Sequence, residues 1–68
     1  MSSEQTWTVT GMTCAHCVAS VTEEVSELPG VERVEVDLAS GALTVVSAEP
    51  LDDETVRAAV DEAGYTLA

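Results

Sequence analysis

The residues most able to do chemistry in this chain lie within four consecutive positions. Cys14, His16 and Cys17 are its two cysteines and its single histidine. They follow a short β-like run and open a helix-like one. Two sulfurs three positions apart at the start of a helix can close on one metal ion, and the positive potential of a helix N-terminus favours the thiolate form. This loop is therefore the candidate functional site, and the other residues are interpreted as the scaffold that presents it.

A Cys-x-x-Cys pair alone is compatible with several kinds of chemistry. Structural zinc wants four ligands, so two cysteines and one histidine would need a carboxylate, water or a second chain as well. A four-cysteine iron–sulfur cluster is excluded within one chain by count. A thiol–disulfide oxidoreductase also uses two thiols, but this chain is short for the thioredoxin fold and lacks the usual aromatic residue before the first cysteine. Cu(I) fits better, because it prefers thiolates and accepts low coordination numbers, and Hg(II) would bind in the same way.

The composition is strongly acidic. The 68 residues carry 13 Asp and Glu side chains against two arginines, and the formal net charge is −11. This balance excludes nucleic acid and anionic membrane surfaces as partners, because phosphate binding needs clustered Lys and Arg. The charge could steer encounter with a basic protein surface, or only keep a small protein soluble. The same two interpretations apply to an acidic set expected on the helices: Glu23, Glu24, Glu27, Asp61 and Glu62.

Length and hydropathy indicate one small domain. Residues 1–68 allow a single domain and no more, and we expect that domain to be complete. No apolar run approaches the ~20 residues of a membrane span, so no membrane insertion is expected. The first five residues lack the basic start and apolar core of a signal peptide, which predicts a cytoplasmic location where thiols stay reduced.

The hydrophobic pattern predicts four strands and two helices. Alternating apolar and polar residues indicate strands at 6–10, 31–38 and 42–46, with Val36, Leu38 and Leu43 among the residues on their inward faces. Residues 65–68 are long enough for a terminal edge strand. Apolar residues at steps of three and four predict one helix over 15–28 and a second from the N-cap Asp52 to a C-cap at Gly64.

The order strand, helix, strand, strand, helix, strand predicts an α+β fold, the ferredoxin-like βαββαβ sandwich. Its four strands should form an antiparallel sheet with both helices on one face. Five residues are expected to show on the other face: Thr6, Thr8, Arg33, Glu35 and Asp37.

Three stretches of the chain form a recognisable pattern. They are Gly-Met-Thr-Cys-Ala-His-Cys at 11–17, valines 18, 21 and 25 followed by Leu-Pro-Gly-Val at 28–31, and Ala-Gly-Tyr at 63–65. With them the chain resembles the heavy-metal-associated domain family over nearly its whole length, as a single such domain over 1–68. A histidine between the cysteines and a tyrosine after the last glycine make it most similar to the bacterial one-domain copper chaperones of that family.

The resemblance implies specific roles and partners. It assigns Cu(I) binding to Cys14 and Cys17, makes Met12 a buried anchor, and places Tyr65 near the metal loop. It implies delivery of copper to a copper-transporting P-type ATPase, in some members to a copper-sensing repressor. It also implies a metal-free monomer that can form a homodimer bridged by copper. The chain has no lysines, so it lacks the basic docking face of some chaperones, and any docking charge must be reversed.

Some expectations carry alternatives. His16 is expected to face solvent, the alternative being a ligand in a copper-bridged dimer. Met12 is expected in the core, and Tyr65 is expected to pack over the loop with its hydroxyl near a sulfur. We expect a Cu(I) chaperone without catalysis, able to take Zn(II) or Hg(II) in vitro. The alternatives are a thiol–disulfide oxidoreductase and a detached regulatory metal-binding domain of a heavy-metal transporter.

Overall fold

Four strands and two helices lie within residues 2–68, the part of the chain that the computed structural model describes. In chain order the elements are β1 (Ser3–Thr10), α1 (Ala15–Ser26), β2 (Val31–Val36), β3 (Ala42–Ser47), α2 (Asp53–Glu62) and β4 (Thr66–Leu67). This order confirms the predicted βαββαβ pattern. No helix in this range is long and apolar enough to cross a membrane.

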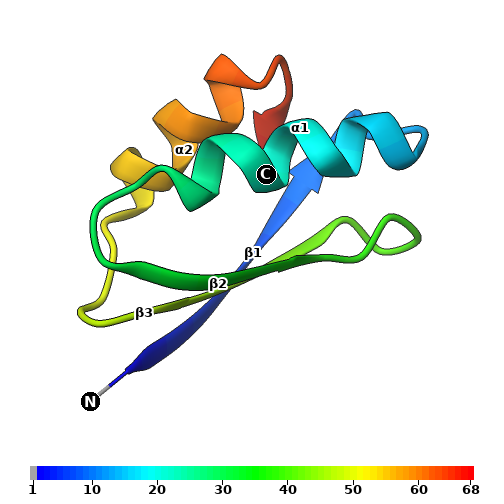
Figure 1. The fold of residues 1–68 in the computed structure, drawn as a ribbon. Helices are drawn as coiled ribbons and strands as arrows, with labels where there is room; N and C mark the ends of the chain where they lie inside the picture. The colour runs from blue at the N-terminus through cyan, green and yellow to red at the C-terminus, as the bar shows by residue number, and fades with distance from the viewer. Residues whose placement is uncertain (1) are drawn as a thin grey trace.

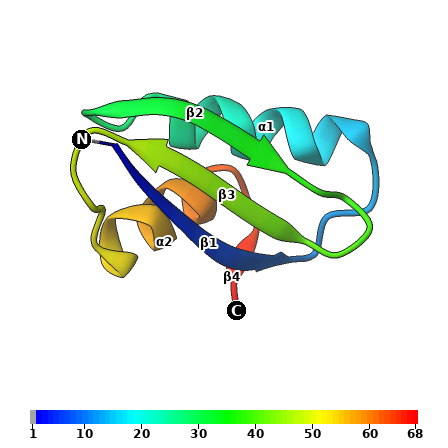
Figure 2. The same cartoon turned by 90° about the horizontal axis from the view of Figure 1, so that it is seen from below.

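The four strands form one antiparallel sheet in the spatial order β2-β3-β1-β4. β1 pairs with β3 from Ser3 to Thr8, whereas β4 pairs with β1 only at Val9 and Thr10. Figure 1 shows both helices on the same side of the sheet, and Figure 2 shows the opposite face of the sheet uncovered. The predicted ferredoxin-like sandwich is therefore confirmed.

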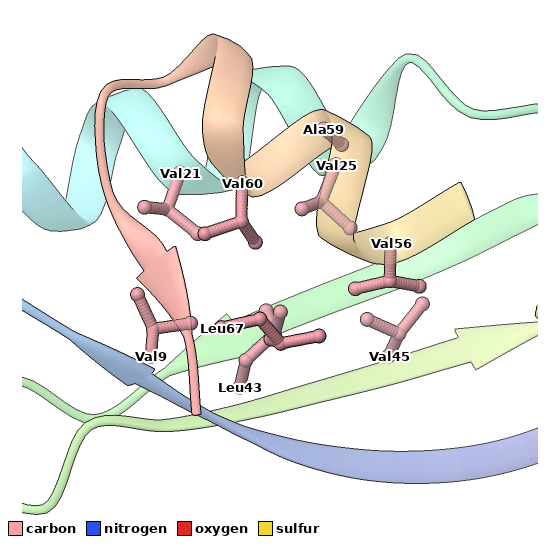
Figure 3. Packing of buried hydrophobic residues seen from close by; sticks show 9 residues of the cluster. All are labelled: Val9, Val21, Val25, Leu43, Val45, Val56, Ala59, Val60 and Leu67. Carbon is pink, nitrogen blue, oxygen red and sulfur yellow. The ribbon is translucent and has the colours of Figure 1, made fainter. Parts of the chain in front are cut away.

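The core lies between the sheet and the two helices (Figure 3). Nine buried apolar residues form it: Val9, Val21, Val25, Leu43, Val45, Val56, Ala59, Val60 and Leu67. Leu43 and Val45 alternate along β3, and Val21 and Val25 are one helical turn apart on α1, so each element turns a single face inward. Each Val or Leu side chain buried in this way contributes about 1.5–3 kcal/mol. The core fixes α1 against the sheet and thereby fixes the loop from which α1 begins.

The predicted ends of some elements were wrong. β1 begins at Ser3 rather than at Thr6, because β3 extends to Ser47 and pairs with it there. α1 ends at Ser26 rather than at residue 28. The N–H of Leu28 donates to the carbonyl of Val25 (3.1 Å), which closes the last turn more tightly than an α-helix does.

The inward position predicted for Leu38 was also wrong. Leu38 is 40% exposed because β2 already ends at Val36. Asp37 then starts the turn into β3: its carbonyl accepts the N–H of Gly41 (2.8 Å), and its carboxylate accepts the N–H of Ala39 (2.9 Å). The alternation of Val34, Val36 and Leu38 in the sequence thus continues past the point where the backbone leaves the sheet.

Candidate metal centre

The loop between β1 and α1 holds both cysteines next to a helix N-terminus. β1 ends at Thr10, and Cys14 is the N-cap of α1 in an extended conformation (φ −157°, ψ 175°). The carbonyl of Cys14 accepts the N–H groups of Cys17 (3.0 Å) and Val18 (3.4 Å). These bonds form the first turn of the helix and bring Cys17 back beside Cys14, as the sequence predicts.

The two thiols face each other but differ in exposure. Their Sγ atoms are 3.7 Å apart and form no disulfide. Cys14 is exposed, whereas Cys17 is only 8% exposed. The pair therefore has one side open to solvent and one side anchored in the protein, which suits a site that an external group must reach.

Hydrogen bonds prepare Cys17 to act as a thiolate. They lower the pKa of its thiol to about 6, mainly through the N–H of Thr13, whose nitrogen is 3.5 Å from Sγ, and next through the Tyr65 hydroxyl. The backbone of Cys14 adds a smaller effect, and partial burial opposes all of them. The first turn of α1 contains no acidic side chain that would counter this stabilisation. The loop therefore favours the thiolate form of Cys17.

Tyr65 is placed at the loop by the way α2 ends. The N–H of Tyr65 donates to the carbonyl of Val60 (3.1 Å) and that of Gly64 to the carbonyl of Asp61 (2.9 Å), the two bonds of a Schellman motif. The cap is Ala63, with the predicted cap Gly64 one residue beyond it. This turn aims the half-buried ring of Tyr65 back toward the loop.

The Tyr65 side chain contacts the loop on two sides. A Cβ built at Gly11 would lie 3.6 Å from its Cδ1, so the ring packs directly against the loop backbone. The interaction of its hydroxyl with the Cys17 side chain raises the pKa of Tyr65, and desolvation and the nearby thiolates raise it further. The phenol therefore stays protonated beside the sulfur.

The other residues expected at the site lie differently. Met12 is half-buried and packs against the core. His16 is exposed. Within residues 2–68, no group of three or more His, Cys, Asp or Glu side chains is arranged to hold a metal ion. The two sulfurs are thus the donors that the fold brings together.

Sequence reasoning missed the contribution of Thr13. Its backbone N–H makes the largest contribution to the low pKa of Cys17, and its hydroxyl lies 3.8 Å from the same sulfur. A backbone donor has no residue-type pattern in a sequence. Only its place between a strand end and a helix N-cap could have indicated it.

The fold and the dithiol loop together define a small α+β domain built around a Cys-x-x-Cys motif. The heavy-metal-associated domain family matches residues 6–66, and this chain belongs to that family. The chain is 36% identical over 66 residues to the copper chaperone CopZ of Bacillus subtilis, covering 96% of each chain. It is 41% identical over 59 residues to the COP-associated protein of Helicobacter felis, covering 87% of this chain and 89% of that one.

Other relatives are much longer proteins. The chain is 40% identical over 58 residues to human copper-transporting ATPase 2 and 43% identical over 63 residues to a probable copper-exporting P-type ATPase of Archaeoglobus fulgidus. These matches cover 84% and 91% of this chain but only 4% and 8% of the ATPases.

Solved structures agree with the fold. A CopZ metallochaperone superposes with a TM-score of 0.89 at 25% identity, covering 97% of this chain and 100% of that one. The apo N-terminal domain of ZntA superposes with a TM-score of 0.89 at 34% identity, covering 100% and 92%.

Proposed function

We propose that this chain is a Cu(I) chaperone without catalytic activity, in which the sulfurs of Cys14 and Cys17 bind the ion. The observation that carries the proposal is the pair of thiols 3.7 Å apart. The lowering of the pKa of Cys17 to about 6 by the loop donors supports it. Two metal–sulfur bonds span about 4.6 Å end to end, so a small opening of the pair admits one ion between the sulfurs. Cu(I) is a soft ion that prefers thiolates and accepts two of them as its ligands. The similarity to CopZ over 96% of both chains supports the same assignment.

The unequal exposure of the two sulfurs supports transfer rather than storage. A thiolate of a partner can approach the bound ion from the open side, next to Cys14. Cys17 stays held by Thr13 and Tyr65, so Cys14 is the first ligand to be replaced. While the partner's thiolate and both cysteines of this chain bind the ion, it is three-coordinate and shared by the two proteins. The ion can then move to the partner without being released to water.

The proposed partner is a copper-transporting P-type ATPase. The basis is the similarity of this chain to parts of such ATPases. The lining of a groove of about 520 Å³ between α1 and α2 includes Glu24, Glu27 and Glu62, so a partner that docks there would present basic residues. A copper-sensing repressor is a second proposed recipient. We also propose a cytoplasmic location, a single domain over 1–68, and a copper-bridged homodimer formed from metal-free monomers.

The test is an anaerobic titration of the reduced protein with Cu(I), in competition with a colorimetric Cu(I) chelator. We expect about one ion per chain or per dimer, and no uptake by the double variant Cys14→Ser/Cys17→Ser. Ala19→Ser is the control, because it makes a similarly small change at an exposed position of α1. Undiminished uptake by the double variant would refute the site. Parallel titrations with Zn(II) and Hg(II) rank the affinities of the site for these metals. The variant His16→Ala tests whether His16 is a further ligand in a copper-bridged dimer.

A thiol–disulfide oxidoreductase is a second candidate, favoured by the low pKa of Cys17 and its closeness to Cys14. Net reduction of a protein disulfide by the metal-free chain would support it. A regulatory domain of a transporter is a third candidate, since the chain matches 4–8% of the long ATPases. The intact mass of the protein isolated from its cells would decide between this domain and a separate chaperone.

A further inference from the structure

One half of β1 has an open edge. β1 is eight residues long, but β4 pairs with it only at Val9 and Thr10. Ser3–Trp7 pair with β3 on one side, and no other strand within residues 2–68 pairs with them on the second side. Figure 2 shows this half of β1 at the margin of the sheet, with β4 beside its other end only and α2 behind it.

Two backbone hydrogen bonds show which way the peptide groups of β1 point. The N–H of Val9 donates to Gly41 in the direction of β3, and the carbonyl of Thr8 accepts the N–H of Ala68 in the direction of β4. Because peptide groups alternate along an antiparallel strand, those of Glu4 and Thr6 point to the open side. An extended segment laid there would find ready hydrogen-bond donors and acceptors.

The opposite margin of the sheet is protected, which makes the open half of β1 distinctive. β2 carries an irregularity in its pairing between Val31 and Arg33, and the exposed charges of Glu32, Arg33 and Glu35 follow one another along it. Bulges and charges of this kind hinder pairing with another strand. In the open half of β1, Glu4 is the one charged side chain and the backbone pairing with β3 is regular.

The acidic start of α2 lies against the open half of β1. The side-chain amide of Gln5 holds the backbone of Leu51 through two hydrogen bonds, donating to its carbonyl (3.1 Å) and accepting its N–H (2.8 Å). The indole N–H of Trp7 donates to the carboxylate of Asp53 (2.9 Å). These contacts fix the start of α2, with Asp52 and Asp53, against the same half of β1.

We propose that the Ser3–Trp7 edge of β1 is a docking site for an extended basic segment of another protein, which joins the sheet as an additional strand. Backbone hydrogen bonds to Glu4 and Thr6 would hold the segment. Lys and Arg at alternate positions share one face of the added strand, so they would meet Glu4 or, with that strand turned over, Asp52 and Asp53. A second copy of this chain fits poorly, because each copy carries a net charge of −11. The site lies on a different element from the dithiol loop and does not depend on copper.

The test uses the metal-free protein and a capped synthetic peptide of alternating Lys and Val. We expect saturable binding seen in the fluorescence of Trp7, the single tryptophan, together with new protection of the Glu4 and Thr6 amides from hydrogen exchange. Replacing Lys by Glu in the peptide, or methylating its backbone nitrogens on the pairing side, should weaken binding about tenfold or more.

Variants of Thr6 separate edge pairing from general charge attraction. Thr6→Pro removes the outward N–H without removing a bond to β3 and should weaken binding about fivefold to tenfold. Thr6→Val keeps that N–H and should bind as the parent does. Absence of saturable binding, equal binding of the methylated peptide, or chemical-shift changes confined to the helices would overturn the proposal. Self-association of the chain through this edge at working concentrations would overturn the assigned occupant.

Discussion

The two helices begin in opposite chemical environments. α1 starts at the dithiol loop with Cys14 as its N-cap and no acidic side chain in its first turn. α2 starts at the other end of the molecule, after the N-cap Asp52, with Asp53 and Glu54 in its first turn (Figure 1). Both N-termini present unpaired N–H groups and positive potential. At α2, carboxylates lie in the positive potential, whereas at α1 only the thiols do. The reactivity of the cysteines therefore depends also on the absence of acidic side chains from the first turn of α1.

The largest expected effect tests this difference at the two N-caps. Loss of a group that only orients a metal ligand lowers metal affinity by up to about 100-fold. Cys14→Ser removes a proposed ligand itself, so it should lower the Cu(I) affinity by more than that. Asp52→Ser makes the matched change at the N-cap of α2 and should leave the affinity unchanged. Competition with a Cu(I) chelator measures both. A Cys14→Ser affinity within tenfold of the parent would contradict the two-thiolate site.

The next largest effect is a difference in stability loss when a glycine in the turn at either end of the molecule is changed to alanine. Gly41 (φ +78°), at the end that carries the dithiol loop, leaves no room for a Cβ, which would lie 2.5 Å from the carbonyl oxygen of Val9. Gly30 (φ +83°), at the opposite end, has nothing within 4 Å of that position. Either change to Ala costs about 1–2 kcal/mol for the backbone conformation, and Gly41→Ala costs about 1–3 kcal/mol more for the clash. Urea unfolding measures the free energy of unfolding of both variants. Equal losses would show that β1 can shift away from a Cβ at position 41 at no cost in stability.

The sequence predicted the scaffold better than the details of the site. Periodicity alone placed Val21, Leu43 and their neighbours in the core, since burial of one face leaves a direct mark on residue type. Leu38 was misplaced, because a backbone turn can end a strand while the alternation of residue types continues. The contribution of Thr13 was missed because it comes from a peptide N–H, which every residue except proline carries.

A smaller effect concerns the ionisation of Cys17. Its pKa of about 6 in the folded protein lies below the 9.0 of an ordinary thiol. The thiolate therefore stabilises the folded state fully above pH 9, and this contribution is lost as the pH falls through about 6. In Cys14→Ser, the ultraviolet absorbance of the remaining thiolate should rise with a midpoint near pH 6, and Tyr65→Phe should move the midpoint upward. A midpoint near 9 in Cys14→Ser would mean that the loop donors do not act on this sulfur.

The smallest expected effect concerns the acidic groove between α1 and α2. If it steers a basic partner, raising the salt from about 0.1 M to 1 M should slow association with the metal-binding domain of a copper-transporting ATPase, because the Debye length falls from about 10 Å to 3 Å. Glu24→Gln/Glu27→Gln should reduce that salt dependence. Glu32→Gln/Glu49→Gln removes the same charge away from the groove and serves as the control. Equal behaviour of the two double variants would show that the charge acts through the whole molecule, and the groove would then be only a solvated surface.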